Sequence, residues 1–259
     1  MNRWLLSGLC LLVALPLRAE IVLDGVGVTA SRSPYPGSVA EVIDRYFTAV
    51  GGVDAWKAVD AIKSEVQSTT RLTGAVDRST EATAQQVWAA DGRFRTVTEV
   101  NGMTVLTLFD GEAMWKRSNN IKPVRIEINP FDLRRGNLLY AHQQLEAIFP
   151  HARIDRDGVD TVAVAFFKAD TDAEPVEVWI FSKETGLRVG SRMLTLAPGM
   201  EPVPVEYRFE DYRAVGAVRM PHRIVYEVET SGVTSRTTLD LVSPVLNPDV
   251  PEGTFSPEF

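Results

Sequence analysis

The stretch Ser38–Val59, SVAEVIDRYFTAVGGVDAWKAV, carries the clearest helix pattern in the sequence and precedes a long series of strand-like segments. The apolar residues of its first half share one helix face by their spacing: Val39, Val42, Ile43, Tyr46, Phe47 and Val50. Glu41, Asp44 and Arg45 fall on the other face. Because the apolar face must be buried, we expect this helix to pack on one face of the sheet that follows.

The ends of this helix have recognisable signals. Ser38, followed three residues later by Glu41, forms a capping box and predicts the N-terminus. Gly51-Gly52 predicts the C-terminus, because glycine accepts the left-handed conformation that follows a helix. Asp54 is predicted to cap a second short turn that carries Trp56.

From residue 61 onward the sequence is typical of antiparallel strands. Asn101-Gly102 and Asp91-Gly92 predict tight hairpin turns, since both residues of a type I′ turn need positive φ. A second helix is predicted over residues 133–149 and is ended by Pro150. The predicted strands are residues 62–72, 81–89, 93–100, 103–109, 113–117, 161–168, 176–182, 187–196, 203–212, 217–230 and 233–242, with 121–128 as a further strand or an extended loop.

Ten or eleven antiparallel strands with two helical insertions are too many elements for a small β-sandwich. The sequence therefore predicts a mainly β (α+β) fold, in which a strongly curved antiparallel sheet wraps around helices packed on its concave face. The concave face should be apolar and the convex face solvated, because segments such as residues 205–210 alternate apolar and charged side chains. The proline-rich tail from Asn247 is predicted to be irregular.

Residues 1–19 have the parts of a secretory signal peptide: the positive charge of Arg3, an apolar run from Trp4 to Leu15, and a small residue, Ala19, after which we expect cleavage. The run is shorter than the roughly 20 residues that span a membrane. We expect residues 20–37 to form an extended lead-in and residues 38–259 to form a single domain. Cys10 is the one cysteine, so the mature chain would have no disulfide.

The formal net charge of −7 becomes more negative when Arg3 and Arg18 leave with the signal. This acidity argues against nucleic acid as a partner. The three histidines, His142, His151 and His222, show no metal-ligand spacing, and we expect His142 to be a partly buried packing residue. The sequence has no nucleophile elbow, phosphate loop or dinucleotide fingerprint. We therefore predict no catalytic residue, no metal and no cofactor.

With no catalytic or metal motif, the apolar side chains are the remaining functional signal. They either fill a core completely or line a cavity with room for an acyl chain. Each methylene removed from water is worth roughly 0.8 kcal/mol, so a chain of about 15 methylenes needs no polar contact for tight binding. We predict that the following residues face inward and line a hydrophobic cavity: Trp88, Phe94, Leu106, Leu108, Trp115, Trp179, Phe181, Met193, Tyr207 and Phe209. Strand parity leaves Val105 and Phe109 open as alternatives to Leu106 and Leu108.

Several motifs carry a family resemblance. Residues 46–56 (YFTAVGGVDAW) and 109–115 (FDGEAMW) resemble the opening of proteins related to the outer-membrane lipoprotein-sorting carriers, which are the LolA/LolB-like superfamily. Residues 207–213 (YRFEDYR) and 219–224 (RMPHRI) are similar to the late strands of that superfamily, and Leu246-Asn247-Pro248 and Phe255 also fit. The resemblance covers roughly residues 38 to 259. It implies a periplasmic unclosed β-barrel whose mouth is covered by helices, with a cavity for acyl chains.

These observations predict an exported, periplasmic, monomeric and non-catalytic carrier or binding protein for a lipid or lipoprotein acyl chain. One alternative is a module that uses the same sheet to bind another envelope protein or act as a sensor. An exposed apolar patch beside a filled interior would favour that reading. A second alternative is a lipid or glycan hydrolase, which a histidine bonded to a serine or carboxylate inside the hollow would favour.

Overall fold

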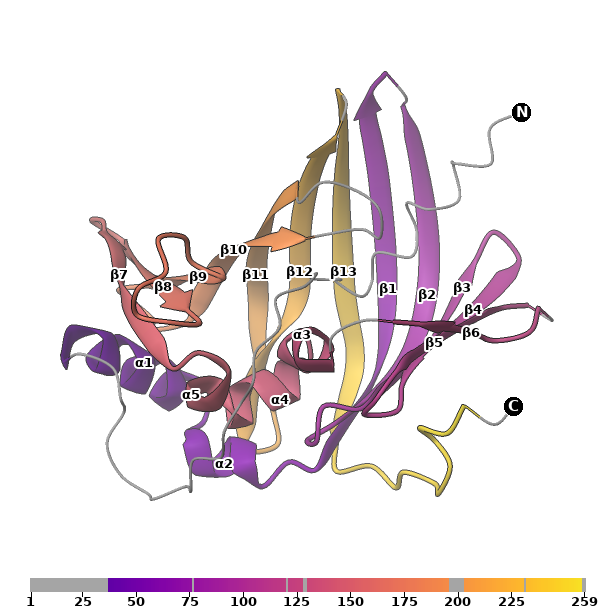
Figure 1. Cartoon of the computed structure of the whole chain (residues 1–259), viewed down its shortest axis with the longest axis horizontal. Coiled ribbons are helices and arrows are strands. Elements are labelled where there is room, and N and C mark those ends of the chain that lie inside the picture. Colours follow the sequence, from indigo (N-terminus) through magenta and orange to yellow (C-terminus); the bar gives the residue numbers. More distant parts are fainter. Residues whose placement is uncertain are drawn as a thin grey trace.

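The computed structural model describes residues 37–75, 77–119, 121–127, 130–195, 203–230 and 232–257. The predicted signal peptide and nearly all of the predicted lead-in lie outside these residues. In the described chain, thirteen strands form one antiparallel sheet in the order β6-β5-β4-β3-β2-β1-β13-β12-β11-β10-β9-β8-β7 (Figure 1). Strands that are neighbours in the sheet are also consecutive in the sequence, except for β1 and β13, and the consecutive strands β6 and β7 form its two edges. The two halves of the chain are joined through that pair.

The strands of the first half are β1 (Ala61–Gly74), β2 (Arg78–Ala89), β3 (Phe94–Val100), β4 (Met103–Phe109), β5 (Met114–Ser118) and β6 (Val124–Ile126). Those of the second half are β7 (His151–Asp157), β8 (Thr161–Phe167), β9 (Glu177–Ser182), β10 (Arg188–Thr195), β11 (Val203–Val215), β12 (Val218–Thr230) and β13 (Val233–Leu246). Strand β7 was missed by the sequence patterns, because HARIDRD offers only Ala152 and Ile154 as apolar positions among charged ones. The tail after Asn247 is irregular up to residue 257, as predicted.

The first helical stretch forms two helices, α1 (Gly37–Ala49) and α2 (Val53–Lys57). Gly51 and Gly52 have φ of 108° and 93°, which confirms the predicted helix end. Both predicted N-caps were wrong. Helix α1 begins at Gly37, so Ser38 lies inside it rather than at the cap. Gly52, not Asp54, occupies the N-cap of α2, and no side chain caps that helix.

The predicted second helix is instead three short ones: α3 (Pro130–Arg135), α4 (Leu138–Gln143) and α5 (Leu145–Ile148). The break between α3 and α4 lies at Asn137. Its side chain accepts hydrogen bonds from the backbone N–H groups of Leu139 and Tyr140 and caps the N-terminus of α4. The break between α4 and α5 lies at Gln144, whose φ of −123° and ψ of 26° are not helical. Two positions, Asn137 and Gln144, therefore divide one predicted helix into three.

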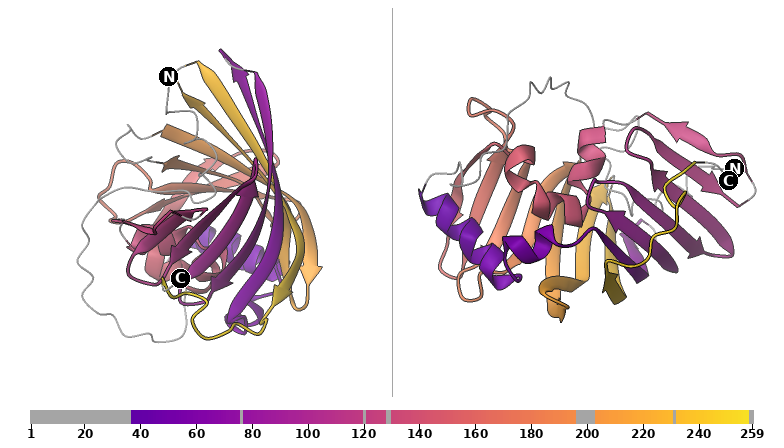
Figure 2. Two further views of the ribbon diagram at one scale, coloured as in Figure 1. Left: turned by 90° about the vertical axis from the view of Figure 1, so that its right-hand side faces the viewer. Right: turned by 90° about the horizontal axis from the view of Figure 1, so that it is seen from below.

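The sheet is strongly curved, and the helices lie in its hollow (Figure 2). We call the face that bears the helices the concave face and the opposite one the convex face. Helix α1 buries Val39, Ile43, Tyr46 and Phe47 there, as the helix pattern predicts. The turn between β11 and β12 fixes its end, since the N–H of Arg219 donates to the carbonyl of Val50 at 2.9 Å. The core thus lies between α1, α2, α4, α5 and the concave face.

Candidate functional site

The deepest part of the concave face is a packed aromatic core. Trp179 and Phe181 of β9 are each 1% exposed. The Tyr46 ring of α1 lies 5.4 Å from that of Phe181, and the Phe166 ring of β8 lies 5.0 Å from that of Trp179, between centroids. The sequence correctly placed Trp179 and Phe181 inward. In this structure they contact other side chains of the chain on the helix-covered side, so a ligand would reach Trp179 only if the helices moved.

A buried polar contact joins α4 to α1. The Nδ1 of His142 lies 2.6 Å from the carbonyl of Leu138 and must donate to it, so Nε2 accepts from the Tyr46 hydroxyl, also at 2.6 Å. The imidazole stacks on the indole of Trp56 with 4.1 Å between centroids. Burial lowers the pKa of His142 to about 4, against the opposing effect of the Leu138 hydrogen bond and with help from the Arg188 charge. His142 is 4% exposed, more deeply buried than predicted.

A buried ion pair lies at the edge of this core. Arg188 of β10 donates to Oε1 of Glu177 at 2.9 Å. The same carboxylate oxygen accepts from the indole N–H of Trp179 at 2.7 Å and the hydroxyl of Ser191 at 2.9 Å. The guanidinium carbon lies 3.9 Å from the Trp179 ring centroid and 4.4 Å from that of Phe209. Nε of Arg188 is buried without a hydrogen-bond partner in the structure described.

Beyond Arg188 the concave face stays aromatic but is less covered. We call Tyr207, Phe209 and Tyr226 the aromatic shelf. The Tyr207 ring lies 6.4 Å from that of Phe209 and 5.4 Å from that of Tyr226. Tyr207 and Phe209 are partly exposed. Three more partly exposed apolar residues share this face by strand register: Met193, Ile224 and Leu239. The predicted site residues Met193, Tyr207 and Phe209 therefore lie together, next to the Trp179 core.

At the other end of the sheet, Trp88 and Phe94 are direct cross-strand partners on the concave face. Phe94 packs with Phe109, Met114 and Leu133 of α3, and Trp88 lies against this cluster. These two predicted residues also face inward. They lie in a cluster of their own, separate from the Trp179 core.

Three of the predicted inward-facing residues lie on the convex face. Phe109 pairs with Phe94 on the concave side, so Leu108, Leu106 and Trp115 point the other way. Leu108 is fully buried there under Phe255 of the C-terminal tail, with Trp115 beside it. The prediction failed because β4 is apolar on both faces, and the tail that covers its convex side carries no strand or helix pattern. Phe109 and Val105 are the inward-facing alternatives.

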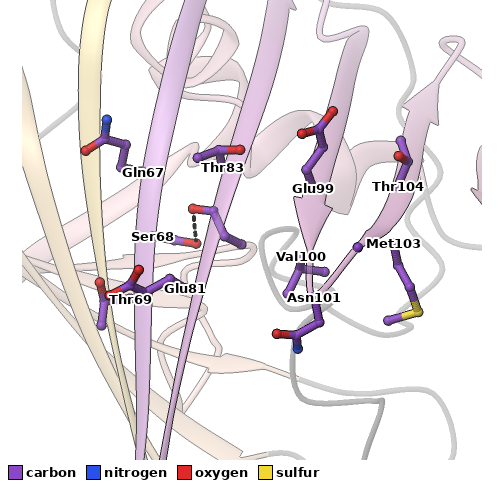
Figure 3. Close-up of a pocket in the computed structure, with 12 residues that line it drawn as sticks. Gln67, Ser68, Thr69, Glu81, Thr83, Glu99, Val100, Asn101, Met103 and Thr104 are labelled. Carbon is purple, nitrogen blue, oxygen red and sulfur yellow. Dashed lines mark hydrogen bonds between the residues drawn. The ribbon is translucent and has the colours of Figure 1, made fainter.

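Two hollows accompany these surfaces. The α1 groove, about 340 Å³, lies between α1 and β7–β9. Its apolar lining is Val42, Ile154, Val162 and Phe181, and its rim carries Glu41, Arg45, Asp157 and Lys183. A polar hollow of about 680 Å³ lies across β1–β4, near the Asn101-Gly102 turn (Figure 3). Gln67, Thr83 and Glu99 are among its lining residues, so it offers hydrogen-bonding groups rather than an apolar floor.

Sequence reasoning missed the residues that fasten the helices to the sheet. Glu177 and Arg188 are the first residues of β9 and β10, where charged side chains are commonly solvated, so neither was distinguishable from a surface residue. Tyr46 was placed in the core, but its hydroxyl partner lies 96 positions away. Gln143 had no signal either, although its amide donates to the carbonyls of Trp56 and Val59 at 2.8 and 2.7 Å.

The described residues offer few groups for catalysis or metal binding. His142 bonds Tyr46 and Leu138, and His222 lies near the carbonyl of Met220 at 3.2 Å; neither bonds a serine or a carboxylate there. No group of three or more His, Cys, Asp or Glu residues in that part of the chain could hold a metal ion. Within the same residues, every helix is too short or too polar to cross a membrane.

Comparison with known proteins supports the fold. No protein-family model matches the sequence. No curated protein matches it either. The structure is similar to that of a LolA superfamily protein from Nitrosomonas europaea, with a TM-score of 0.54 and 13% identity over 83% of this chain and 96% of that chain. A DUF1329 family protein from Desulfovibrio piger gives a TM-score of 0.50 and 14% identity over 79% and 92%. The chain therefore has the fold of the LolA superfamily, as the sequence resemblance implied.

Proposed function

We propose that this chain is an exported, periplasmic binding protein or carrier for an acyl chain of a lipid or lipoprotein, and that it performs no catalysis. The observation that carries the proposal is the aromatic shelf. Apolar side chains continue along the concave face from the packed Trp179 core onto partly exposed positions, including Phe209 and Met193. The likeness of the fold to that of a LolA superfamily structure supports the proposal.

The energetics favour an acyl ligand on such a surface. Burial of each methylene contributes roughly 0.8 kcal/mol, so even eight methylenes laid on the shelf would gain about 6 kcal/mol before the costs of binding. The α1 groove, at about 340 Å³, falls at the lower end of the roughly 300–1,000 Å³ typical of small-molecule sites. It opens beside Phe181 and could take the end of a chain.

We expect the ligand to contact Met193, Tyr207 and Phe209 first. Trp179 and Phe181 would join the site if α1 and α4 moved away from the sheet. Trp88 and Phe94 would extend it toward β3. Leu106, Leu108 and Trp115 are left out, because they lie on the convex face.

A titration with a fluorescent fatty acid tests the proposal. Phe209→Asp places a charge on the shelf and should weaken binding at least tenfold, since a carboxylate would have to be buried beneath the chain. Val245→Asp is the matched control, because Val245 is 50% exposed on the convex side of β13, opposite Lys63 of β1. Equal affinity of both variants and the unmodified protein would contradict the proposed site.

A second candidate function is recognition of another envelope protein, and the α1 groove favours it. Its apolar floor and mixed-charge rim suit an apolar side chain flanked by charges in a partner segment. A photo-crosslinking residue at Val42 would test this reading. Specific crosslinking to one envelope protein, with no uptake of fatty acid, would support the second candidate over the first.

A further inference from the structure

One row of polar side chains crosses the concave face beside an apolar row. Its members are direct cross-strand neighbours on β1 to β5, and we call them the polar row: Ser64, Gln86, Thr96, Thr107 and Lys116. An apolar row lies on one side of the polar row, two residues away along each strand. Its members are Ile62, Trp88, Phe94, Phe109, Met114 and Ile126. On the other side lie Val66, Ala84, Thr98, Val105 and Ser118. Adjacent rows are about 7 Å apart.

The polar row is graded from buried to open. Ser64, Gln86 and Thr96 are buried, and Gln86 donates to the Ser64 hydroxyl at 2.9 Å. Thr107 and Lys116, at the β5 end, are partly exposed. A buried polar residue costs stability unless it finds a partner, and the Gln86–Ser64 bond supplies one at the buried end of the row, while the open end faces solvent.

Lys116 supplies the charge of this row. Its register neighbours on the flanking strands are Thr107 and Val124, and neither carries a charge. Among the described residues Lys116 forms no ion pair, whereas Lys183 is paired with Asp157 at 2.5 Å. In a chain whose formal charge is −7, this places an ammonium group on the concave face beside the Phe94 cluster, with no carboxylate paired to it in the part of the chain that the structure describes.

We propose that the polar row binds the anionic end of an amphiphile whose hydrocarbon part lies on the partly exposed apolar residues beside it, Trp88 and Ile126. This inference rests on the proposed function and specifies its ligand class. Lys116 would pair with the anionic group, while the Thr107 and Thr96 hydroxyls donate hydrogen bonds to its oxygens. A carboxylate and a phosphate both satisfy this chemistry. A neutral alcohol would leave the ammonium partly desolvated without a counter-charge.

The test compares ligands that share one chain and differ in the head group. Palmitate, hexadecanol and palmitoyl lysophosphatidic acid would each displace a fluorescent fatty acid from the full mature protein. Palmitate or the phosphate should bind at least about tenfold tighter than hexadecanol, the size of one charge-assisted contact. Whichever of the two anions binds tighter shows whether the polar row prefers a carboxylate or a phosphate.

Substitutions at Lys116 test whether this residue causes the preference for anionic ligands. In Lys116→Met the anionic preference should fall to near unity while hexadecanol affinity is unchanged, and Lys116→Arg should keep it. Lys63→Met is the control, since Lys63 is exposed on the convex side of β1. A preference that survives in Lys116→Met, or hexadecanol binding as tightly as palmitate to the unmodified protein, would overturn this inference alone. Failure of all three ligands to bind would overturn the proposed function as well.

Discussion

The guanidinium of Arg188 lies over the indole of Trp179, with 3.9 Å between Cζ and the ring centroid. The same group contacts Phe209 at 4.4 Å and is paired with Glu177. Arg188 thus stands where the packed core meets the aromatic shelf. Its charge is held by one buried carboxylate and two aromatic faces, an arrangement that fixes the position of both surfaces relative to each other.

We expect Arg188→Met to destabilise the protein by about 3–5 kcal/mol, because it leaves the Glu177 carboxylate buried without its counter-charge. Arg223→Met is the control, since Arg223 and Asp240 form an exposed pair at 2.7 Å, and an exposed pair contributes only about 0–1 kcal/mol. Urea unfolding of both variants measures the difference. Equal losses would mean that the buried pair contributes no more than a surface pair.

The His142 contact predicts how stability depends on pH. Its pKa is about 4 in the folded state, below the ordinary value of about 6.5, so the unfolded chain binds more protons between these two values. Stability from this group is therefore complete above pH 6.5 and is lost as the pH falls toward 4. The total loss is about 3 kcal/mol.

Urea unfolding at a series of pH values checks this prediction. His142→Gln removes the titrating group and should lose less stability than the unmodified protein between pH 6.5 and 4, although it starts lower because the Tyr46 contact is altered. Parallel pH profiles for the two proteins would exclude His142 as the source of the dependence.

Alanine substitutions at the two glycines after α1 distinguish the cost of a steric collision from the cost of backbone strain. Gly51 and Gly52 both have positive φ, so alanine is strained at either position. A Cβ on Gly51 would also collide with the carbonyl oxygen of Ala217, whereas one on Gly52 would meet open space. Gly51→Ala should therefore cost clearly more than the roughly 1–3 kcal/mol of Gly52→Ala.

Thermal unfolding of the two glycine variants measures this difference. It tests whether the end of α1 is seated on the β11–β12 turn, as the bond from Arg219 to Val50 indicates. If the two variants unfold at the same temperature, α1 does not dock there in solution.

The sequence predicted the architecture well where the residue pattern has a direct physical reading. The helix over residues 38–50 was found because its apolar residues repeat with helical spacing, and Val39, Ile43 and Tyr46 are buried as expected. The Asn101-Gly102 turn was found because both residues need positive φ, which they have at 48° and 73°. The curved sheet with helices on its concave face, and its likeness to the LolA superfamily fold, followed from these elements and the family motifs.

The candidate site was harder to predict, because residue type does not say which face of a strand is covered. Leu108 and Phe109 are adjacent and equally apolar, yet Phe109 meets Phe94 under α3 and Leu108 meets Phe255 of the tail. The contact that decides between them comes from a segment more than 140 residues away. The Glu177–Arg188 pair was missed for the same reason, since its burial depends on strands and helices that only the folded chain brings together.

Native mass spectrometry of the protein purified from its own envelope fraction tests the central claim most directly. We expect a population of the folded protein to carry one acylated molecule, released on activation, and the Phe209→Asp variant to lose it. Apoprotein alone, together with no uptake of added fatty acid by the unmodified protein, would contradict the assignment of the concave face as an acyl-chain site.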